Sequence, residues 1–229
     1  MIGETFSRTE RLLGEAAMKR LSASRVAVFG IGGVGGYVAE ALARSGVGAL
    51  DLFDNDTVSE SNLNRQIIAL RSTVGQYKVD VMRDRIADIC PNTKVIPHRC
   101  FYMPEIAAEY PFDGYDFVVD AVDTVTAKLT IIEQANRAGV PVISCMGTGN
   151  KVDPSRLVLT DISKTSVCPL ARVMRKELRD RGISHVTVVY STESPRVSER
   201  PPASIMYVPA SAGLLIASHV VNTLTEKKD

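Results

Sequence analysis

The chain has 229 residues, of which 45% are hydrophobic and 23% are charged, and its formal net charge is +1. This length and composition can bury a full core without disulfides or a structural metal, so we expect one globular domain over residues 1–229. A net charge so close to zero argues against a protein that coats nucleic acid nonspecifically. The absence of tryptophan and the low aromatic content, 6%, argue against a stacking platform for single strands.

The amino-terminal segment, residues 1–24, is predicted to be helical and precedes the first strand. Residues 1–8 lack the apolar core of a signal peptide, so we expect a cytoplasmic protein. Near the other end, residues 210–224 form an apolar stretch that is shorter than a membrane span and contains Ser, His and Asn. We expect a core helix there and no membrane association.

A glycine-rich turn follows the first predicted strand. Residues 25–29 are mainly apolar and lead into the sequence Gly-Ile-Gly-Gly-Val-Gly at 30–35, and a helix is predicted from about Val34 to Ser45. Glycines in such a turn let backbone N–H groups approach a phosphate, and the positive end of the helix faces the same point. Taken alone, the pattern fits NAD, FAD and ATP sites. The residues that we assign to the nucleotide are Gly30, Gly32, Gly33 and Gly35.

The second predicted strand ends in an acidic residue. Residues 49–53 are mainly apolar, and Asp54 follows them 24 positions after Gly30, near the spacing expected of a carboxylate that accepts from ribose hydroxyls. The alternative is an aspartate that caps a turn before Asn55 and Asp56. The glycine turn at the appropriate distance favours the ribose function.

Two stretches downstream of Asp54 fit poorly with a dehydrogenase. Residues 54–67, with Ser-Asn-Leu-Asn-Arg-Gln at 61–66, and residues 74–78, Val-Gly-Gln-Tyr-Lys, resemble the adenylating superfamily of ThiF and the ubiquitin-activating enzymes. This superfamily includes the sulfur-carrier activators of molybdopterin and thiamin synthesis. The resemblance runs across most of the chain and implies a single ThiF-type domain, ATP as the nucleotide, and a homodimer. It also implies four site residues: Asn62 and Arg65 on the triphosphate, Lys78 on the phosphates, and Arg11, often supplied by the other subunit.

The chemistry of ATP cleavage suits these residue types. Breaking the bond between the α and β phosphates develops charge on pyrophosphate, which fixed Arg and Lys cations stabilise more in the transition state than in the ground state. Taken singly, Arg65 could be a solvated loop charge, and Lys78 could lie on the exposed first turn of the amphipathic helix that follows. The glycine turn and Asp54 favour the functional interpretation of both.

A fourth strand, predicted over residues 115–121, delivers Asp120 and Asp123 to its carboxyl end, where open α/β sheets place their ligands. The family has a metal-contacting aspartate here, and the pattern Asp-Ala-Val-Asp-Thr matches it to Asp123, which would hold Mg²⁺ on the phosphates. We expect Asp120 to brace the turn. The sequence therefore predicts an α/β fold with a Rossmann-like, doubly wound, mainly parallel sheet. Its nucleotide-binding core covers residues 25–150, and C-terminal strands and helices over 151–229 form a substrate-side extension.

Four cysteines, Cys90, Cys100, Cys145 and Cys168, include no Cys-x-x-Cys pair. Sulfur-carrier activators commonly hold a structural zinc with two such pairs, which this chain cannot build from neighbouring ligands. Cys145 ends an apolar strand, and we expect it to be buried. Cys168 precedes Pro169 at a predicted helix start, where the dipole favours a thiolate, so it is the one thiol to test as a nucleophile. Burial in an inert core is the alternative.

Beyond residue 150, the sequence predicts a strand over residues 156–161 and a basic helix that starts at Pro169 and ends before Gly182. This helix carries five basic and two acidic residues, a net charge of +3. A solvated helix face is the ordinary interpretation of such a pattern, and an anionic partner is the alternative.

Three segments of this half, residues 161–171, 190–193 and 208–214, resemble the branch of the superfamily whose ATP-dependent dehydratases act on threonylcarbamoyladenosine beside the tRNA anticodon. The resemblance implies that ATP adenylates the threonyl carboxylate and that the tethered carbamoyl group closes a ring and expels AMP, so no enzyme thiol is needed. It makes tRNA the expected partner, with a cysteine desulfurase system as a further one. The residues that we assign to the RNA backbone are Arg172, Arg175, Lys176 and Arg179.

Residues 191–204 form the only long polar, proline-containing stretch. We expect a mobile loop that closes over the site or lies against RNA, or that is disordered without function. Two other functions stay open on the sequence: adenylation of the carboxyl terminus of a sulfur-carrier or ubiquitin-like protein, and noncatalytic binding of NAD.

Overall fold

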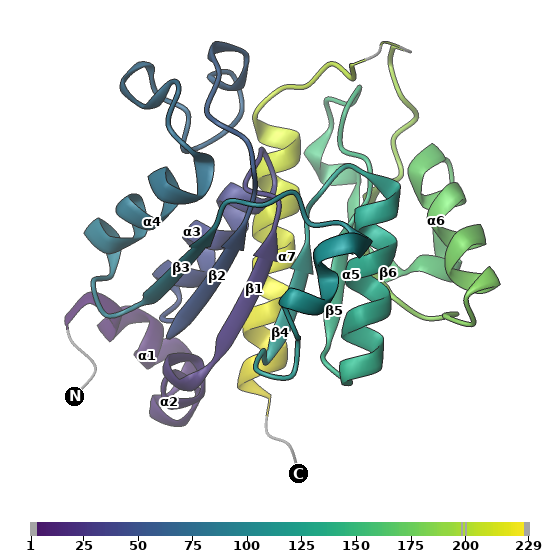
Figure 1. The fold of residues 1–229 in the computed structure, drawn as a ribbon. Helices are drawn as coiled ribbons and strands as arrows, with labels where there is room; N and C mark the ends of the chain where they lie inside the picture. The colour runs from purple at the N-terminus through teal and green to yellow at the C-terminus, as the bar shows by residue number, and fades with distance from the viewer. Residues whose placement is uncertain (1–3, 198, 200, 227–229) are drawn as a thin grey trace.

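The computed structural model describes residues 4–197, 199 and 201–226, which form a seven-stranded sheet with helices on both faces (Figure 1). The strands are β1 (Arg25–Phe29), β2 (Ala49–Phe53), β3 (Lys94–His98), β4 (Phe117–Asp120), β5 (Val142–Cys145), β6 (Leu157–Asp161) and β7 (Thr187–Ser191). The α-helices are α1 (Ser7–Leu13), α2 (Glu15–Ala23), α3 (Gly35–Arg44), α4 (Lys78–Ile89), α5 (Val125–Ala138), α6 (Pro169–Asp180) and α7 (Tyr207–Thr225). Short 3₁₀ turns include η2 (Glu60–Asn62) and η4 (Pro104–Glu109).

The strand order is β3-β2-β1-β4-β5-β7-β6, and all neighbours are parallel except β6, which runs antiparallel to β7. The chain builds outward from β1 to β3 and then returns to place β4 on the other side of β1. The loops after β1 and β4 therefore diverge and leave a crevice at the carboxyl ends of the strands. This topology confirms the predicted α/β, doubly wound, mainly parallel fold.

The inner strands are apolar along their length because helices cover both faces of the sheet. Every residue of β1 and β2 after the first is buried, as is all of β4. One core lies between the sheet and α3, α4 and α7, and two smaller cores lie on the opposite face beneath α5, α6 and η4. These cores hold the strand ends, and hence the loops that follow them, in a fixed arrangement.

Helix α7 runs along one face of the sheet, packs against α3, and buries Val208, Ala212, Ile216 and Val220. It begins three residues before the apolar stretch 210–224, where a core helix was predicted. At 19 residues, with a mean hydropathy of 1.2 over its 18-residue window, it is long and apolar enough to cross a membrane, so the expectation that it is too short was wrong. Half of that window is buried inside the protein, as in a core helix.

Strand β7 was not predicted. It inserts between β5 and β6, so the sheet continues without a break from residues 25–150 into residues 151–229. We call these two parts the nucleotide half and the substrate half, after the functions predicted for them. Its residues, Thr-Val-Val-Tyr-Ser, are mostly β-branched or aromatic, which is the composition that favours strands. The signal was therefore present in the sequence.

Candidate nucleotide-binding site

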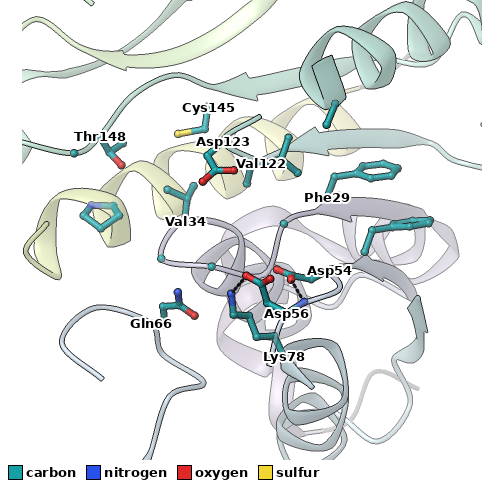
Figure 2. A pocket seen from close by; sticks show the side chains of 18 of the residues that line it. Phe29, Val34, Asp54, Asp56, Gln66, Lys78, Val122, Asp123, Cys145 and Thr148 are labelled. Atoms are coloured by element: carbon teal, nitrogen blue, oxygen red, sulfur yellow. Dashed lines mark hydrogen bonds and ion pairs between the residues drawn. The ribbon is translucent and has the colours of Figure 1, made fainter. Parts of the chain in front are cut away.

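A cavity of about 770 Å³ opens at the carboxyl ends of the central strands (Figure 2), and its volume is typical of small-molecule sites. The glycine turn, the loop after β2, the turn after β4 and the loop after β5 converge on it. The sequence-predicted residues that line it are Gly30, Gly32, Gly33, Asp54, Asn62, Arg65, Lys78 and Asp123.

The turn after β1 requires glycine at two positions for steric reasons. Gly30 has a φ of 87°, and a Cβ there would lie 2.8 Å from the carbonyl oxygen of Ala121, directly after β4. A Cβ on Gly35 would lie 1.8 Å from the carbonyl oxygen of Gly30. Gly35 therefore closes the turn and is not among the cavity-lining residues, whereas Gly32 and Gly33 are. Because α3 begins at Gly35, its positive dipole end lies at the cavity.

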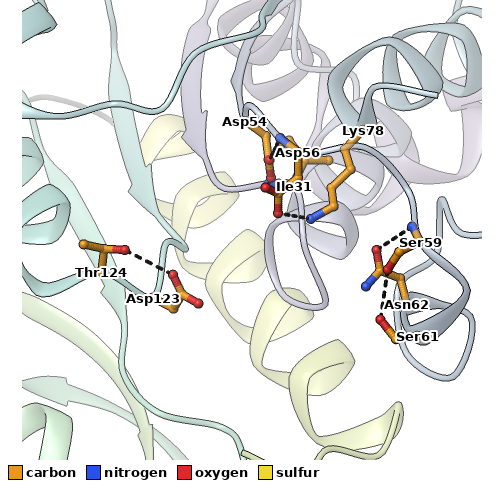
Figure 3. A network of polar contacts seen from close by, with 9 residues as sticks. All are labelled: Ile31, Asp54, Asp56, Ser59, Ser61, Asn62, Lys78, Asp123 and Thr124. Carbon is orange, nitrogen blue, oxygen red and sulfur yellow. Dashed lines mark hydrogen bonds and ion pairs between the residues drawn. The ribbon is translucent and has the colours of Figure 1, made fainter. Parts of the chain in front are cut away.

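Asp54 follows β2, and its carboxylate joins two backbone segments. Oδ2 accepts from the N–H of Ile31 in the glycine turn at 2.7 Å, and Oδ1 accepts from the N–H of Asp56 at 2.8 Å (Figure 3). Burial raises the pKa of Asp54, and the positive charge of Lys78 opposes this rise. The contact with Asp56 is the turn-capping contact that the alternative interpretation of Asp54 predicts. Each oxygen keeps a second lone pair, so the carboxylate can also accept from a ribose hydroxyl.

Lys78 begins α4 but is buried, and its Nζ lies 2.7 Å from Oδ2 of Asp56. The alternative of an exposed first-turn lysine was therefore wrong. The side chain of Asp56 is 60% exposed and lines the cavity, so this ion pair can rearrange when an anion enters. Asp56 was not predicted as a site residue, although its position two residues after Asp54 was an available signal.

Asn62 and Arg65 lie on the loop between β2 and α4. Oδ1 of Asn62 accepts from the N–H of Ser59 at 3.1 Å, which fixes the amide at the cavity wall. Nη1 of Arg65 donates to the carbonyl oxygen of Ser61 at 2.8 Å and to Oδ1 of Asn64 at 3.0 Å. Both acceptors are neutral, so they leave the guanidinium charge uncompensated at the cavity.

Gln66 is a cavity residue that was not predicted from the sequence. Its side chain is buried, and within the described ranges its Oε1 has no hydrogen-bond partner. A buried acceptor without a donor is costly, so Oε1 favours a ligand or water that donates to it. The signal was its place directly after Arg65 in the motif.

The two aspartates of the β4 turn have different surroundings. Asp120 is fully buried, where Oδ2 accepts from Nζ of Lys128 at 2.9 Å and from the hydroxyl of Ser144, and Oδ1 accepts from the N–H of Val122 at 3.2 Å. These contacts brace the turn, as expected. Asp123 is exposed and points into the cavity (Figure 2).

In the turn after β4, Asp123 is the carboxylate that faces the cavity, and this arrangement suits one mode of metal binding. Among residues 4–197, 199 and 201–226, no group of three or more His, Cys, Asp or Glu side chains could hold a metal ion. Mg²⁺ is commonly held by one or two carboxylates together with substrate phosphates and water. Asp123 fits that mode beside a bound triphosphate.

Arg11 lies away from the cavity. It is exposed on α1, near the amino ends of the strands, whereas the cavity is at their carboxyl ends (Figure 1). The chain's own Arg11 therefore does not complete this site. Its contribution from another subunit stays a prediction.

The loop after β5 forms the wall of the cavity opposite the loop between β2 and α4. Residues 147–149 line the cavity. Behind them, the carboxylate of Glu193 accepts from the N–H groups of Val152 and Asp153 at 3.1 and 2.9 Å. The Ser-Thr-Glu segment at 191–193, which carried part of the resemblance, therefore holds this wall without lining the cavity.

The described part of the predicted mobile loop, 191–204, is joined to the same wall. The carbonyl oxygen of Asn150 accepts from the N–H of Arg196 at 2.8 Å, and Oδ1 of Asn150 accepts from the N–H of Ala203 at 2.7 Å. Residues 198 and 200 lie outside the described residues. The mobility of the loop stays a prediction.

Both thiols singled out from the sequence are buried. Cys145 lines the cavity, and burial raises its pKa to about 12, so it is a neutral thiol near pH 7. Cys168 precedes α6 and is 4% exposed, and it is not among the cavity-lining residues. This burial favours the inert alternative for Cys168.

Helix α6 begins at Pro169 and is followed by Gly182 with a φ of 76°, as the sequence predicted. Nη1 of Arg175 turns back and donates to the carbonyl oxygen of Thr165 at 2.7 Å and to its hydroxyl. This guanidinium therefore fastens the preceding loop to the helix. The assignment of Arg175 to RNA stays a prediction.

The other basic residues of α6 form an exposed stripe. Arg172, Lys176 and Arg179 lie at helical spacing on one face and are all exposed. Leu170, two residues before Arg172 in the first turn of α6, lines the cavity. The amino end of α6 is therefore near the cavity, and the stripe runs along the helix away from that end.

Comparison with known proteins gives a consistent result. A family model described as the ThiF family matches residues 6–229. The chain is 44% identical to the tRNA threonylcarbamoyladenosine dehydratase of Bacillus subtilis, over 96% of this chain and 94% of that protein, and 40% identical to the Escherichia coli enzyme of the same name, over 83% and 74%. A crystal structure of E. coli tRNA N6-threonylcarbamoyladenosine dehydratase, TcdA, in complex with ATP superposes with a TM-score of 0.91 at 36% identity, covering 98% of this chain and 96% of that one.

Proposed function

The chain belongs to the ThiF family, and from that membership we propose that it is an ATP-dependent dehydratase that cyclises threonylcarbamoyladenosine in tRNA through an adenylated carboxylate. Two relatives that are at least 40% identical carry the name of this activity, and a solved relative holds ATP. The observation that carries the proposal is the convergence of the glycine turn, Asp54, Arg65, Lys78 and Asp123 on one cavity.

In this proposal, the nucleotide half binds ATP and stabilises the charge of its cleavage. Backbone N–H groups of the glycine turn and the amino end of α3 bind phosphate, and Asp54 accepts from the ribose. Arg65 and Lys78 stabilise the charge that develops on pyrophosphate. Mg²⁺ held through Asp123 would supply further charge neutralisation at the phosphates.

The reaction then has two displacements. A carboxylate oxygen of the substrate attacks the α-phosphorus, and pyrophosphate leaves, which gives an acyl-adenylate. The carbamoyl group of the same nucleoside then attacks the acyl carbon and loses a proton, and AMP departs with the former carboxylate oxygen, so the nucleoside loses one water in total. Tethering supplies the effective concentration for ring closure. The scheme uses no protein thiol, in agreement with the neutral, buried Cys145.

The RNA contact that we propose is the exposed stripe of Arg172, Lys176 and Arg179. Its charges can contact successive phosphates without reading the sequence, and its start beside Leu170 would direct the modified nucleoside toward the cavity. Arg175 would join this contact only if its guanidinium left Thr165.

We further propose that Arg11 acts across a homodimer. If it does, an Arg11→Ala protein and an Asp123→Ala protein, each inactive alone, should regain part of the activity when they are mixed and allowed to exchange subunits. No recovery in mixed dimers that native mass spectrometry identifies would contradict this arrangement.

The test of the function is mass spectrometry of digested tRNA after incubation with the protein and ATP–Mg²⁺. We expect threonylcarbamoyladenosine to lose one water, with AMP and pyrophosphate formed in equal amounts. Unchanged nucleoside despite calorimetric binding of ATP would remove the tRNA assignment. Pyrophosphate exchange that depends on a protein ending in Gly-Gly would favour a sulfur-carrier activator instead.

A further inference from the structure

The loop after β5 carries backbone N–H groups that the fold does not use. The N–H of Met146 donates to the carbonyl oxygen of Val189 at 2.8 Å, and the N–H of Asn150 donates to the carbonyl oxygen of Ala203 at 2.7 Å. Between these two anchors, the N–H groups of residues 147–149 have no backbone or side-chain acceptor among the described residues. All three residues line the cavity. We call them the wall loop, and its three donors are available to a ligand.

The wall loop consists of one threonine between two glycines. A Cβ on Gly149 would lie 2.7 Å from Cβ of Pro202, so the close packing of the loop requires glycine there. In Figure 2, Thr148 lies on the same side of the cavity as Asp123, across from Lys78, and its hydroxyl points into the space between the two sides. The loop therefore offers the cavity bare backbone and one hydroxyl.

The cations of the cavity belong to other segments. Among the described residues that line it, the positively charged ones are Arg65, in the loop between β2 and α4, and Lys78, the first residue of α4. In the proposed function, both act on the phosphates of ATP. The substrate carboxylate attacks the α-phosphorus roughly in line with the departing pyrophosphate, and hence from its opposite side. It therefore needs donors other than the cations that hold the pyrophosphate, and the wall loop supplies them.

Neutral donors suit a carboxylate that has to react. Successive backbone N–H groups are a common binding site for anions. A cation would stabilise the carboxylate most in the ground state, where its charge is complete, and would thereby raise the barrier to attack. Hydrogen bonds from N–H and O–H groups are weaker than those from a cation, but they still fix the orientation. The wall loop can hold one carboxylate oxygen while the other attacks the phosphorus.

The same donors suit the second step of the proposed reaction. In the acyl-adenylate, the held oxygen is the carbonyl oxygen. When the carbamoyl group attacks the acyl carbon, the electron pair of the C=O bond moves to this oxygen, and it returns as the bond to AMP breaks. Preorganised N–H and O–H donors stabilise the charge of such an oxyanion more than they stabilise the carbonyl group.

We propose that the wall loop, with the hydroxyl of Thr148, is the binding site of the substrate carboxylate. It orients the carboxylate for adenylation and stabilises the oxyanion during ring closure. This inference rests on the proposed function. It makes Thr148 a residue that binds the acid and takes no part in binding ATP.

The experiment is a single turnover of tRNA that carries threonylcarbamoyladenosine with ATP–Mg²⁺, followed by rapid quench. Thr148→Val replaces the hydroxyl by a methyl group of similar size. We expect the release of pyrophosphate and the conversion of the acyl-adenylate each to slow about 10- to 100-fold, less than for loss of a principal oxyanion donor because the N–H groups remain. Thr148→Ser keeps the hydroxyl and should restore most of both rates. Calorimetry should show unchanged affinity for ATP and for tRNA without the threonylcarbamoyl group, which also shows that the variant is folded.

The matched control is Thr126→Val, the same change at an exposed position of α5. It should keep the wild-type rates. If the wild-type protein converts the nucleoside and Thr148→Val does so at the wild-type rate, the inference is overturned while the proposed function stands. If the wild-type protein binds ATP but leaves the nucleoside unchanged, the proposed function fails and takes the inference with it.

Discussion

The nucleotide half and the substrate half of the sheet use their motif residues differently. In the nucleotide half, the motif side chains Asn62, Arg65, Lys78 and Asp123 reach the cavity. In the substrate half, Glu193 and Arg175 bond to neighbouring backbone instead. A sequence signature can therefore mark chemistry in one half and the scaffold of a cavity wall in the other.

The largest effect is expected at the buried ion pair beneath the nucleotide site. Lys128 and Asp120 are both 0% exposed, so Lys128→Met leaves a buried carboxylate without its cation. We expect the free energy of unfolding to fall by about 3–5 kcal/mol. Urea unfolding followed by circular dichroism measures this change.

Two further variants define the control for this ion pair. The double variant Lys128→Met/Asp120→Asn removes both charges and should recover much of the loss. Lys19→Met, which breaks the exposed pair with Glu15, should leave the midpoint nearly unchanged. A Lys128→Met protein as stable as the wild type would show that Asp120 is protonated or solvated, and the account of a charge-braced turn would be wrong.

The next effect is catalytic. Lys78→Met removes a cation from the cavity but leaves Asp56, which is largely exposed, free to be solvated. We expect single-turnover AMP formation on threonylcarbamoyladenosine-containing tRNA to slow about 100- to 1,000-fold, as for loss of one fixed charge-stabilising group. Lys94→Met, at the exposed start of β3, is the matched control.

A Lys78→Met protein with the wild-type rate would mean that Lys78 only neutralises Asp56. In that case, this motif residue of the nucleotide half would have a structural function, as Glu193 and Arg175 have in the substrate half. The two halves would then differ less in how they use their motif residues.

Local features explain how much of the site the sequence could predict. Gly30 and Asp54 directly follow β1 and β2, and Asp123 lies three residues after the end of β4, so the ends of the apolar runs in the sequence indicated all three. The burial of Lys78 depends on Asp56, 22 residues earlier in the chain, and an isolated bridge between Thr57 and Tyr77 brings the two together. No local pattern contains that pairing.

The substrate half was harder to predict for the same physical reason. The helix of Arg175 was predicted with correct ends, because Pro169 and Gly182 are local signals. The direction of its side chain was not predicted, since Thr165 becomes a partner only when the loop folds back. The place of β7 between β5 and β6 is likewise set by long-range pairing.

A smaller effect is expected from the wall residue Glu193, and it depends on pH. The N–H groups of Asp153 and Val152 lower the pKa of Glu193 below its unfolded value. A carboxylate with a lowered pKa contributes stability that is present above the unfolded pKa, about 4.3, and that is lost as pH falls through the folded pKa. Glu193→Gln should therefore flatten the decline in stability on the acid side of this value.

Urea midpoints measured across this acid range, in wild type and Glu193→Gln, test the assignment. Asp113→Asn, at an exposed loop position, provides the control for loss of one carboxylate. If the urea midpoints of wild type and Glu193→Gln fall in parallel as the pH is lowered, the charge of Glu193 does not help to hold the cavity wall.

The smallest effect separates two arginines of the same helix. Arg172→Ala should weaken tRNA binding and reduce the slope of log K against log salt by about 1, the value for one lost phosphate contact, with little change in Tm. Arg175→Ala should lower Tm, because the loop at Thr165 loses its fastening, and should leave the salt slope unchanged. If the two variants exchange these outcomes, Arg175 must leave Thr165 when RNA binds. The substrate half would then place its basic motif on the ligand, as the nucleotide half does.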